Sequence, residues 1–107
     1  MVSFQEFQKI ELKVAKVLEV EDIPGKDKLY KMKIDLGDEQ KQIVAGIKPF
    51  YTKEDLTGKN IVVVANLEPA TIAGVKSECM LLAAKDINGN YTLVTVESEV
   101  RPGTRVE

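Results

Sequence analysis

The sequence predicts an all-β fold, a small barrel built from five or six short strands. Short runs of apolar and β-branched residues end at Pro, Gly, Asn or Asp, as expected for strands joined by turns. The only two segments with helical patterns are short and do not alternate with strands, which argues against a parallel α/β sheet. A chain of 107 residues, 44% hydrophobic and 30% charged, forms one globular domain over residues 1–107.

The N-terminal segment is predicted to be a short helix over residues 3–9. Ser3 and Glu6 have the spacing of a capping box, and Phe4, Phe7 and Ile10 follow at helical spacing. This apolar stripe belongs either to the core or to a contact between two copies of the chain.

The first two strands are expected at residues 12–23 and 29–36, with Pro24 and Gly25 in the turn between them. The first strand has apolar residues on both faces, as in a strand that curls and pairs on two sides of a barrel. The second alternates cleanly. Its inner face carries Tyr30, Met32, Ile34 and Leu36, and its outer face carries Lys31, Lys33 and Asp35.

The remaining strands are expected at residues 41–45, 60–67, 80–85 and 91–96. A short helical turn begins at Thr52, capped with the help of Asp55. Asn88-Gly89 predicts a type I′ turn between the last two strands. The segment from Asn66 to Ser77 is predicted to be a polar loop. Five curled strands with a helical link after the third describe an OB-type barrel with short helices and terminal extensions.

Composition excludes several kinds of chemistry. The chain has no histidine and one cysteine, Cys79, so one chain cannot build a zinc site or a Ser-His or Cys-His nucleophile. We expect no catalytic residue, no metal and no cofactor, although composition alone still allows a carboxylate or lysine enzyme. No apolar run reaches the length of a membrane span, and the N-terminus lacks the pattern of a signal peptide. The expected location is the cytoplasm, with no membrane partner.

Charge is segregated along the chain, although the net charge is only −2. Residues 24–33 carry four lysines against one acidic residue, Asp27. The sign then reverses at Asp35, Asp38 and Glu39. Long-range attraction to a polyanion is therefore not expected, and any nucleic-acid contact must be short-range.

Residues 65–84, A-N-L-E-P-A-T-I-A-G-V-K-S-E-C-M-L-L-A-A, resemble the signature of the dimeric tRNA-binding domain family. That family includes stand-alone bacterial tRNA-binding proteins, the C-terminal domain or beta subunit of methionyl-tRNA synthetases, and an export-associated chaperone. Residues 4–17, 27–30, 43–51 and 102–103 resemble it as well. Cys79 is a departure, because glycine is expected there; its side chain either shifts the loop or points inward.

The resemblance implies an OB-fold homodimer that binds folded tRNA by shape and largely independently of sequence. Such a domain is not an enzyme by itself. It serves as an auxiliary domain or subunit that raises the tRNA affinity of an aminoacyl-tRNA synthetase, here methionyl-tRNA synthetase, whose catalytic part is then a partner. The tRNA-binding residues that the resemblance carries over are Lys28, Asn66, Lys76, Ser77 and Met80.

Physical reasoning supports these roles and adds two residues. Lysines supply charge for phosphates, short polar groups suit the sugar and backbone, and Met80 can pack against a base. Lys31 and Lys33, on the outer side of the second strand, extend the same surface, with Lys26 as a further cation.

Each of these residues also has an ordinary structural explanation. The strand lysines can simply be solvated, Asn66 can cap its own loop, Ser77 can form a local turn, and Met80 can fill the core. The alternative function is a dimeric chaperone-like protein of the same fold that binds peptides in an apolar groove.

Overall fold

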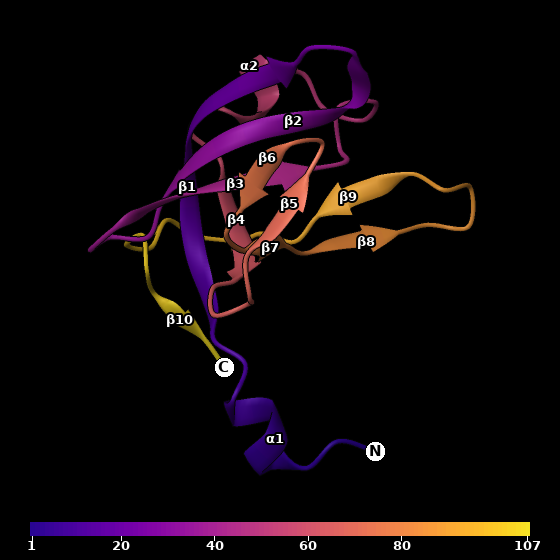
Figure 1. The fold of residues 1–107 in the computed structure, drawn as a ribbon. Helices are drawn as coiled ribbons and strands as arrows, with labels where there is room; N and C mark the ends of the chain where they lie inside the picture. The colour runs from indigo at the N-terminus through magenta and orange to yellow at the C-terminus, as the bar shows by residue number, and fades with distance from the viewer.

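The computed structural model describes residues 1–107 as an antiparallel barrel from which an N-terminal helix and two hairpins project (Figure 1). The all-β prediction is confirmed. The elements, in chain order, are α1 (Phe4–Gln8), β1 (Leu12–Ile23), β2 (Lys26–Asp35), β3 (Gln40–Ala45), α2 (Lys53–Leu56), β4 (Asn60–Val64), β5 (Ala70–Ile72), β6 (Val75–Ser77), β7 (Met80–Leu81), β8 (Ala83–Lys85), β9 (Tyr91–Leu93) and β10 (Arg105–Val106).

The long strand β1 organises the main sheet, whose order is β3-β2-β1-β4-β7, with β10 also paired to β1. Residues 12–16 of β1 pair with β4, and residues 16–23 pair with β2. A register shift between Val17 and Glu19 bends the strand near the point where it changes partners. The predicted curling of this strand is confirmed.

The barrel closes between β3 and the segment that follows β6, through side chains as well as backbone. The Glu78 N–H donates to the Gln42 carbonyl (2.9 Å), and the Gln42 N–H donates to Glu78 Oε1 (3.1 Å). The Val44 N–H donates to Ser77 Oγ (3.0 Å), and the Ser77 hydroxyl donates to the Cys79 carbonyl (3.2 Å). Because these bonds satisfy edge groups of β3, they join the two ends of the curled sheet.

The core fills the barrel with residues from alternating positions of its strands. Met32 and Ile34 of β2, Ile43 of β3, and Ile61 and Val63 of β4 are at most 1% exposed. The side chain of Cys79, the residue before β7, is also part of this cluster. Cys79 is therefore accommodated inward, and burial raises the pKa of its thiol to about 11, which makes it an unreactive apolar residue.

The segment predicted as a loop between Asn66 and Ser77 instead contains a hairpin, β5–β6 (Figure 1). Ala73 (φ 54°) and Gly74 (φ 77°) both lie in the left-handed region, as a type I′ turn requires. The prediction was wrong because alanine rarely adopts positive φ, so Ala73-Gly74 gave no turn signal. The strand predicted over residues 60–67 also ends earlier than expected, because β4 stops at Val64.

A hairpin around Asn88-Gly89 is present as predicted, but the strand expected at 80–85 is divided into β7 and β8, and the strand expected at 91–96 ends at Leu93. The turn of this hairpin, β8–β9, is not type I′. Asn88 does not have a positive φ, and the Gly89 N–H donates to the Asp86 carbonyl (3.1 Å). The Asp86 carboxylate accepts from the N–H groups of Asn88 (2.8 Å) and Asn90 (2.9 Å), and such bonds lower its pKa. The local carboxylate thus selects a different turn from the one that Asn-Gly predicts.

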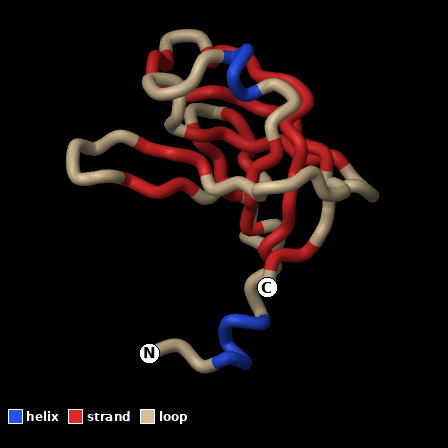
Figure 2. Tube along the Cα trace, turned by 180° about the vertical axis from the view of Figure 1, so that it is seen from behind, coloured by secondary structure: helices blue, strands red, loops and turns tan.

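Helix α1 stands clear of the barrel at the end where the chain terminates (Figures 1 and 2). Ser3 caps it, since the Glu6 N–H donates to Ser3 Oγ (3.1 Å). No residue of α1 is buried, and Phe4 is 71% exposed. The apolar stripe is therefore not part of the core of this chain. Neither helix of the structure is long and apolar enough to cross a membrane.

We predict that Ser77→Ala destabilises the barrel. The Val44 N–H would lose its acceptor in a buried position, which costs about 1–3 kcal/mol. In thermal denaturation this corresponds to a decrease of roughly 4–8 °C per kcal/mol for a domain of this size. Ser98→Ala, an exposed position, is the matched control and should change stability by no more than about 0.5 kcal/mol. Equal midpoints for the two variants would contradict the closure role of Ser77.

Candidate nucleic-acid interface

The predicted lysines of β2 lie on the outer face of the barrel, in a shallow polar hollow. This hollow has a volume of about 180 Å³ and is lined by Glu19, Glu21, Lys31, Lys33 and Gln42. Lys31 faces Glu21 across the sheet, and its Nζ lies 3.6 Å from Glu21 Oε2. Lys33 is opposite Glu19 and has no ion pair within 4 Å. Of the two, Lys33 is the better placed to meet a phosphate.

A glutamine links this hollow to the β5–β6 hairpin. Gln42 is opposite Lys33 in the sheet register, and its Nε2 donates to the Lys76 carbonyl (2.9 Å). Lys76 itself is exposed and pairs with Thr71 on the face of the hairpin opposite Ser77. Lys33, Gln42 and Lys76 therefore form one continuous polar strip from β2 to β6.

Lys28 lies near the opposite end of β2, in a second cationic group. Lys28 lies five positions before Lys33, which corresponds to a distance of about 16 Å along an extended strand. Its carbonyl accepts from the Lys48 N–H (3.3 Å), which holds the two lysines next to each other. Lys26 is also exposed at this end of the barrel.

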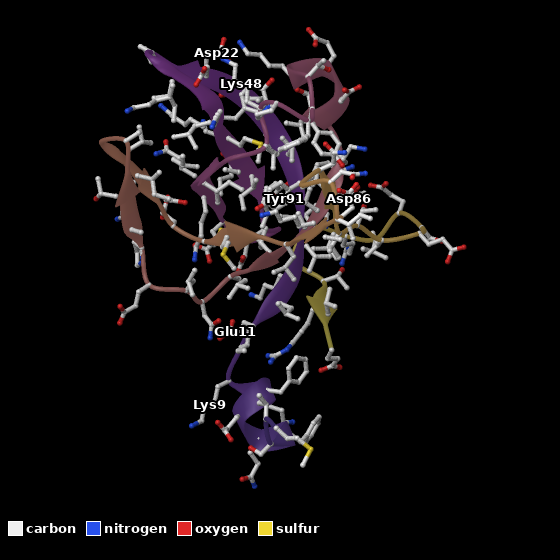
Figure 3. All side chains as sticks on the ribbon, turned by 90° about the vertical axis from the view of Figure 1, so that its right-hand side faces the viewer. Lys9, Glu11, Asp22, Lys48, Asp86 and Tyr91 are labelled. Carbon is white, nitrogen blue, oxygen red and sulfur yellow. The ribbon has the colours of Figure 1, made fainter.

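The Asp22 carboxylate forms ion pairs with two further lysines beside this group, Lys48 and Lys53. Figure 3 shows Asp22 next to Lys48. Its carboxylate oxygens lie 2.8 Å from Lys48 Nζ and 2.8 Å from Lys53 Nζ. Hydrogen bonds from Lys48 and Lys53 lower the pKa of Asp22, and the same pairing raises the pKa of Lys53. Lys48 and Lys53 are cations that the sequence analysis did not select, because they come from a loop and a helix far from the lysine-rich segment.

Asn66 does not cap its own loop; it binds the linker between α1 and β1. Its Oδ1 accepts from the Glu11 N–H (2.9 Å), and its Nδ2 donates to the Lys9 carbonyl (2.7 Å). Lys9 and Glu11 mark this linker at the lower end of Figure 3. The amide is exposed and keeps one further N–H unused within the chain.

Ser77 is the last residue of β6 and is buried, whereas Met80 is the first residue of β7 and is exposed. Ser77 is 6% exposed, and both of its hydrogen bonds belong to the barrel closure. Met80 is 48% exposed and lines an apolar groove with Ile72, so it is not core filler. The structure thus brings Lys33 and Lys76 onto one strip, places Met80 beside the same hairpin, and leaves Lys28 and Asn66 at other ends of the barrel.

Two residues that hold this arrangement together without being predicted RNA contacts were missed by the sequence analysis. Gln42 and Glu78 hold the hairpin against β3, yet nothing in their local sequence distinguishes them from solvated strand residues. Their role can be recognised only in the folded structure, where both side chains are partly buried. No three His, Cys, Asp or Glu side chains come together as metal ligands.

The closed antiparallel barrel places the chain in the class of OB-type barrel domains. Over residues 12–105 it matches the family described as "Putative tRNA binding domain". The chain belongs to this family of tRNA-binding domains.

Two curated relatives are methionine–tRNA ligases. The chain is 52% identical over 99 residues to that of Methanocaldococcus jannaschii, covering 92% of this chain and 15% of the relative. It is 50% identical over 105 residues to that of Thermotoga maritima, covering 98% of this chain and 16% of the relative. The chain therefore spans only a small part of the length of these relatives.

Two solved structures share the whole fold. The MetRS related protein from Pyrococcus horikoshii has a TM-score of 0.94 and 37% identity, covering 100% of this chain and 98% of that one. The chaperone CsaA from Bacillus anthracis has a TM-score of 0.91 and 32% identity, covering 100% of this chain and 99% of that one. Both kinds of protein named by the resemblance are thus similar to this chain in structure.

We predict that Asn66→Ala loosens α1 while leaving the barrel stable. Two hydrogen bonds to the linker are lost, and both are exposed, so the thermal midpoint should fall little. Amide hydrogen exchange of residues 4–11 should become faster by about tenfold, because local opening of the linker becomes easier. Asn88→Ala is the control, since Asn88 is exposed and bonds Asp86 through its backbone N–H, which the substitution keeps. Unchanged exchange in Asn66→Ala would rule out this anchoring role.

Proposed function

We propose that this chain binds folded tRNA, as a homodimer, by reading shape more than sequence. The observation that carries the proposal is the continuous strip from Lys33 through Gln42 to Lys76, in a member of a tRNA-binding domain family. Cations on a fixed surface suit phosphates at defined spacing. Because the net charge is −2, the attraction acts only at short range.

Each site residue has a proposed role that fits its surroundings. Lys28, Lys33 and Lys76 contact phosphates directly. Lys31 joins them by leaving Glu21, at little cost because the pair is exposed and weak. Asn66 donates its unused amide proton to the RNA backbone, and Met80 packs against a base. Ser77 contributes indirectly, by holding Lys76 and Met80 on either side of the closure.

We further propose that the domain is not catalytic by itself and serves an aminoacyl-tRNA synthetase as an auxiliary tRNA-binding part in the cytoplasm. Its matches to methionine–tRNA ligases cover about one sixth of those enzymes, as expected for an appended domain. Methionyl-tRNA synthetase is therefore the proposed partner. The increase in the tRNA affinity of the synthetase would come from a second contact with the same tRNA, with no change in the catalytic site.

The second candidate is peptide binding by a chaperone-like dimer. The likeness to the chaperone CsaA and an apolar groove beside Met80 favour it. It does not account for exposed Lys28, Lys33 and Lys76, which contribute nothing to an apolar peptide contact. Measurable affinity for an unfolded apolar peptide, with none for tRNA, would establish this candidate instead.

For tRNA binding, we predict that Lys28→Glu and Lys76→Glu each weaken affinity by about 1.5–3 kcal/mol, the cost of a charged hydrogen bond. With roughly three to five phosphates contacted, log affinity should fall with log salt concentration with a slope of about −2 to −5. Each substitution should reduce the magnitude of that slope by roughly one.

Arg101→Glu is the matched control for these two variants. It makes the same change of charge in the C-terminal loop, and its affinity should remain near that of the wild type. Equal wild-type affinity for folded tRNA and for an unstructured polynucleotide of the same length would argue against shape recognition.

For the dimer, we predict a solution mass of twice 11.9 kDa at micromolar concentration. Phe4, Phe7 and Ile10 of the α1 segment form with Val106 a groove of about 560 Å³ that nothing in the chain covers. Burial of this surface in a second copy would stabilise the pair by about 25 cal/mol per Å² of apolar area.

Phe7→Asp should therefore weaken dimerisation by at least about tenfold, because it buries a charge in that contact. Ile87→Asp, which changes an apolar residue at the β8–β9 turn that is even more exposed than Phe7, should leave the mass unchanged. A wild-type mass of one chain in light scattering would refute the dimer.

A further inference from the structure

An apolar groove lies beside β3 and the β5–β6 hairpin, next to the lysine strip. Its volume is about 480 Å³, within the range of about 300–1,000 Å³ typical of small-molecule sites. Val44, Ile72, Met80, Leu82 and Tyr91 are among its lining residues, and no carboxylate is. Val44 is opposite Lys31 in the sheet register, so the groove begins where the lysine-bearing face ends.

One wall of the groove is an aromatic ring held in a fixed orientation. The Tyr91 ring meets Phe50 edge to face, with 5.5 Å between centroids and an angle of 63°. Lys85 Nζ lies 5.8 Å from the centroid of the Tyr91 ring. An aromatic face beside a cation is the arrangement on which nucleic-acid bases stack in single-strand binders. Figure 3 views the molecule from the side on which the β8–β9 hairpin projects, and it labels Tyr91 at the start of β9.

The groove also offers free backbone groups at Gly46. This residue is exposed, and neither its N–H nor its C=O makes a hydrogen bond within the chain. One donor and one acceptor beside an apolar surface can pair with the polar edge of a planar base. Such groups discriminate poorly between bases, which agrees with binding that does not depend on sequence.

We propose that this groove binds one unpaired, unstacked base of the tRNA, stacked on Tyr91 and covered by Met80 and Ile72. The proposal rests on the proposed tRNA-binding function and adds a requirement to it: the RNA must present an unpaired base near the phosphates held by the lysine strip. A base is favoured over an apolar peptide because no carboxylate lines the groove, because Lys85 Nζ lies over the Tyr91 ring, and because Val44 of the groove is opposite Lys31 in the sheet. Fully paired RNA of equal length should therefore bind more weakly than tRNA.

The proposal can be tested with a substitution that adds a side chain at Gly46, a residue that lines the groove. A Cβ at Gly46 would contact only Leu29 Cδ2 at 3.9 Å and the Lys28 carbonyl at 4.0 Å, and Gly46 does not have a positive φ. Gly46→Leu therefore meets no steric obstacle at its Cβ and adds bulk at a position that lines the groove. Met80→Ser is a second variant that removes one wall. Thr92→Leu is the control, because it adds similar bulk to β9 at an exposed position next to Tyr91 that alternates to the other face.

We expect Gly46→Leu to weaken tRNA binding by roughly 5- to 150-fold, the usual worth of one stacked base. The salt slope and the affinity for duplex RNA should stay unchanged, because the phosphate contacts remain. In chemical probing of the tRNA, wild type and Thr92→Leu should protect one unpaired base that Gly46→Leu leaves reactive. Met80→Ser should weaken tRNA binding in the same direction, again without a change in salt slope.

Failures of the two proposals are distinguishable. If the wild-type protein has no affinity for tRNA, the proposed function itself fails. If it binds tRNA and Gly46→Leu binds equally well with the same protection pattern, only the base-binding groove is overturned. Loss of affinity for an apolar peptide, or loss of the dimer, in Gly46→Leu with tRNA affinity unchanged would assign the groove to a peptide or to a second copy of the chain.

Discussion

The junction between β3 and the segment after β6 is the constraint on which the rest of the structure depends. Two main-chain groups of β3 are satisfied there by the side chains of Ser77 and Glu78, and Gln42 returns a bond to the hairpin. An open sheet edge would leave these groups without partners and would leave the hairpin unattached. The same few bonds therefore close the core and fix the position of every candidate contact on β5, β6 and β7.

This arrangement explains how an acidic chain can offer a polyanion a defined surface. Glu19 and Glu21 neutralise part of the β2 face, so the free cations are few and are fixed in position. Lys76 projects from one side of the hairpin, and the apolar groove with Met80 opens on the other. Phosphate contacts and a base contact would then flank a single two-stranded element. On this proposal, specificity for folded RNA would follow from the spacing of these contacts rather than from total charge.

Much of the fold could be predicted because its strands have strong local patterns. The alternation in β2 and the buried run in β4 identify both strands, and the Thr52–Asp55 capping box is present as expected. The β5–β6 hairpin could not be predicted, because its turn depends on Ala73 adopting a left-handed conformation that alanine disfavours. Likewise, the lysines and Met80 are visible in the sequence, whereas the barrel closure by Ser77 and the linker anchor at Asn66 depend on partners 33 to 57 residues away.

The central claim is that one face of the barrel, organised by this closure, meets the RNA. Lysine footprinting tests it most directly, by comparing the acylation of each lysine in the free protein and in the complex with folded tRNA. The account predicts that Lys33 and Lys76 lose reactivity together on binding, while Lys59, in the connection between α2 and β4, remains reactive. Protection of Lys59 with full reactivity of Lys33 and Lys76 would place the RNA elsewhere and contradict the account.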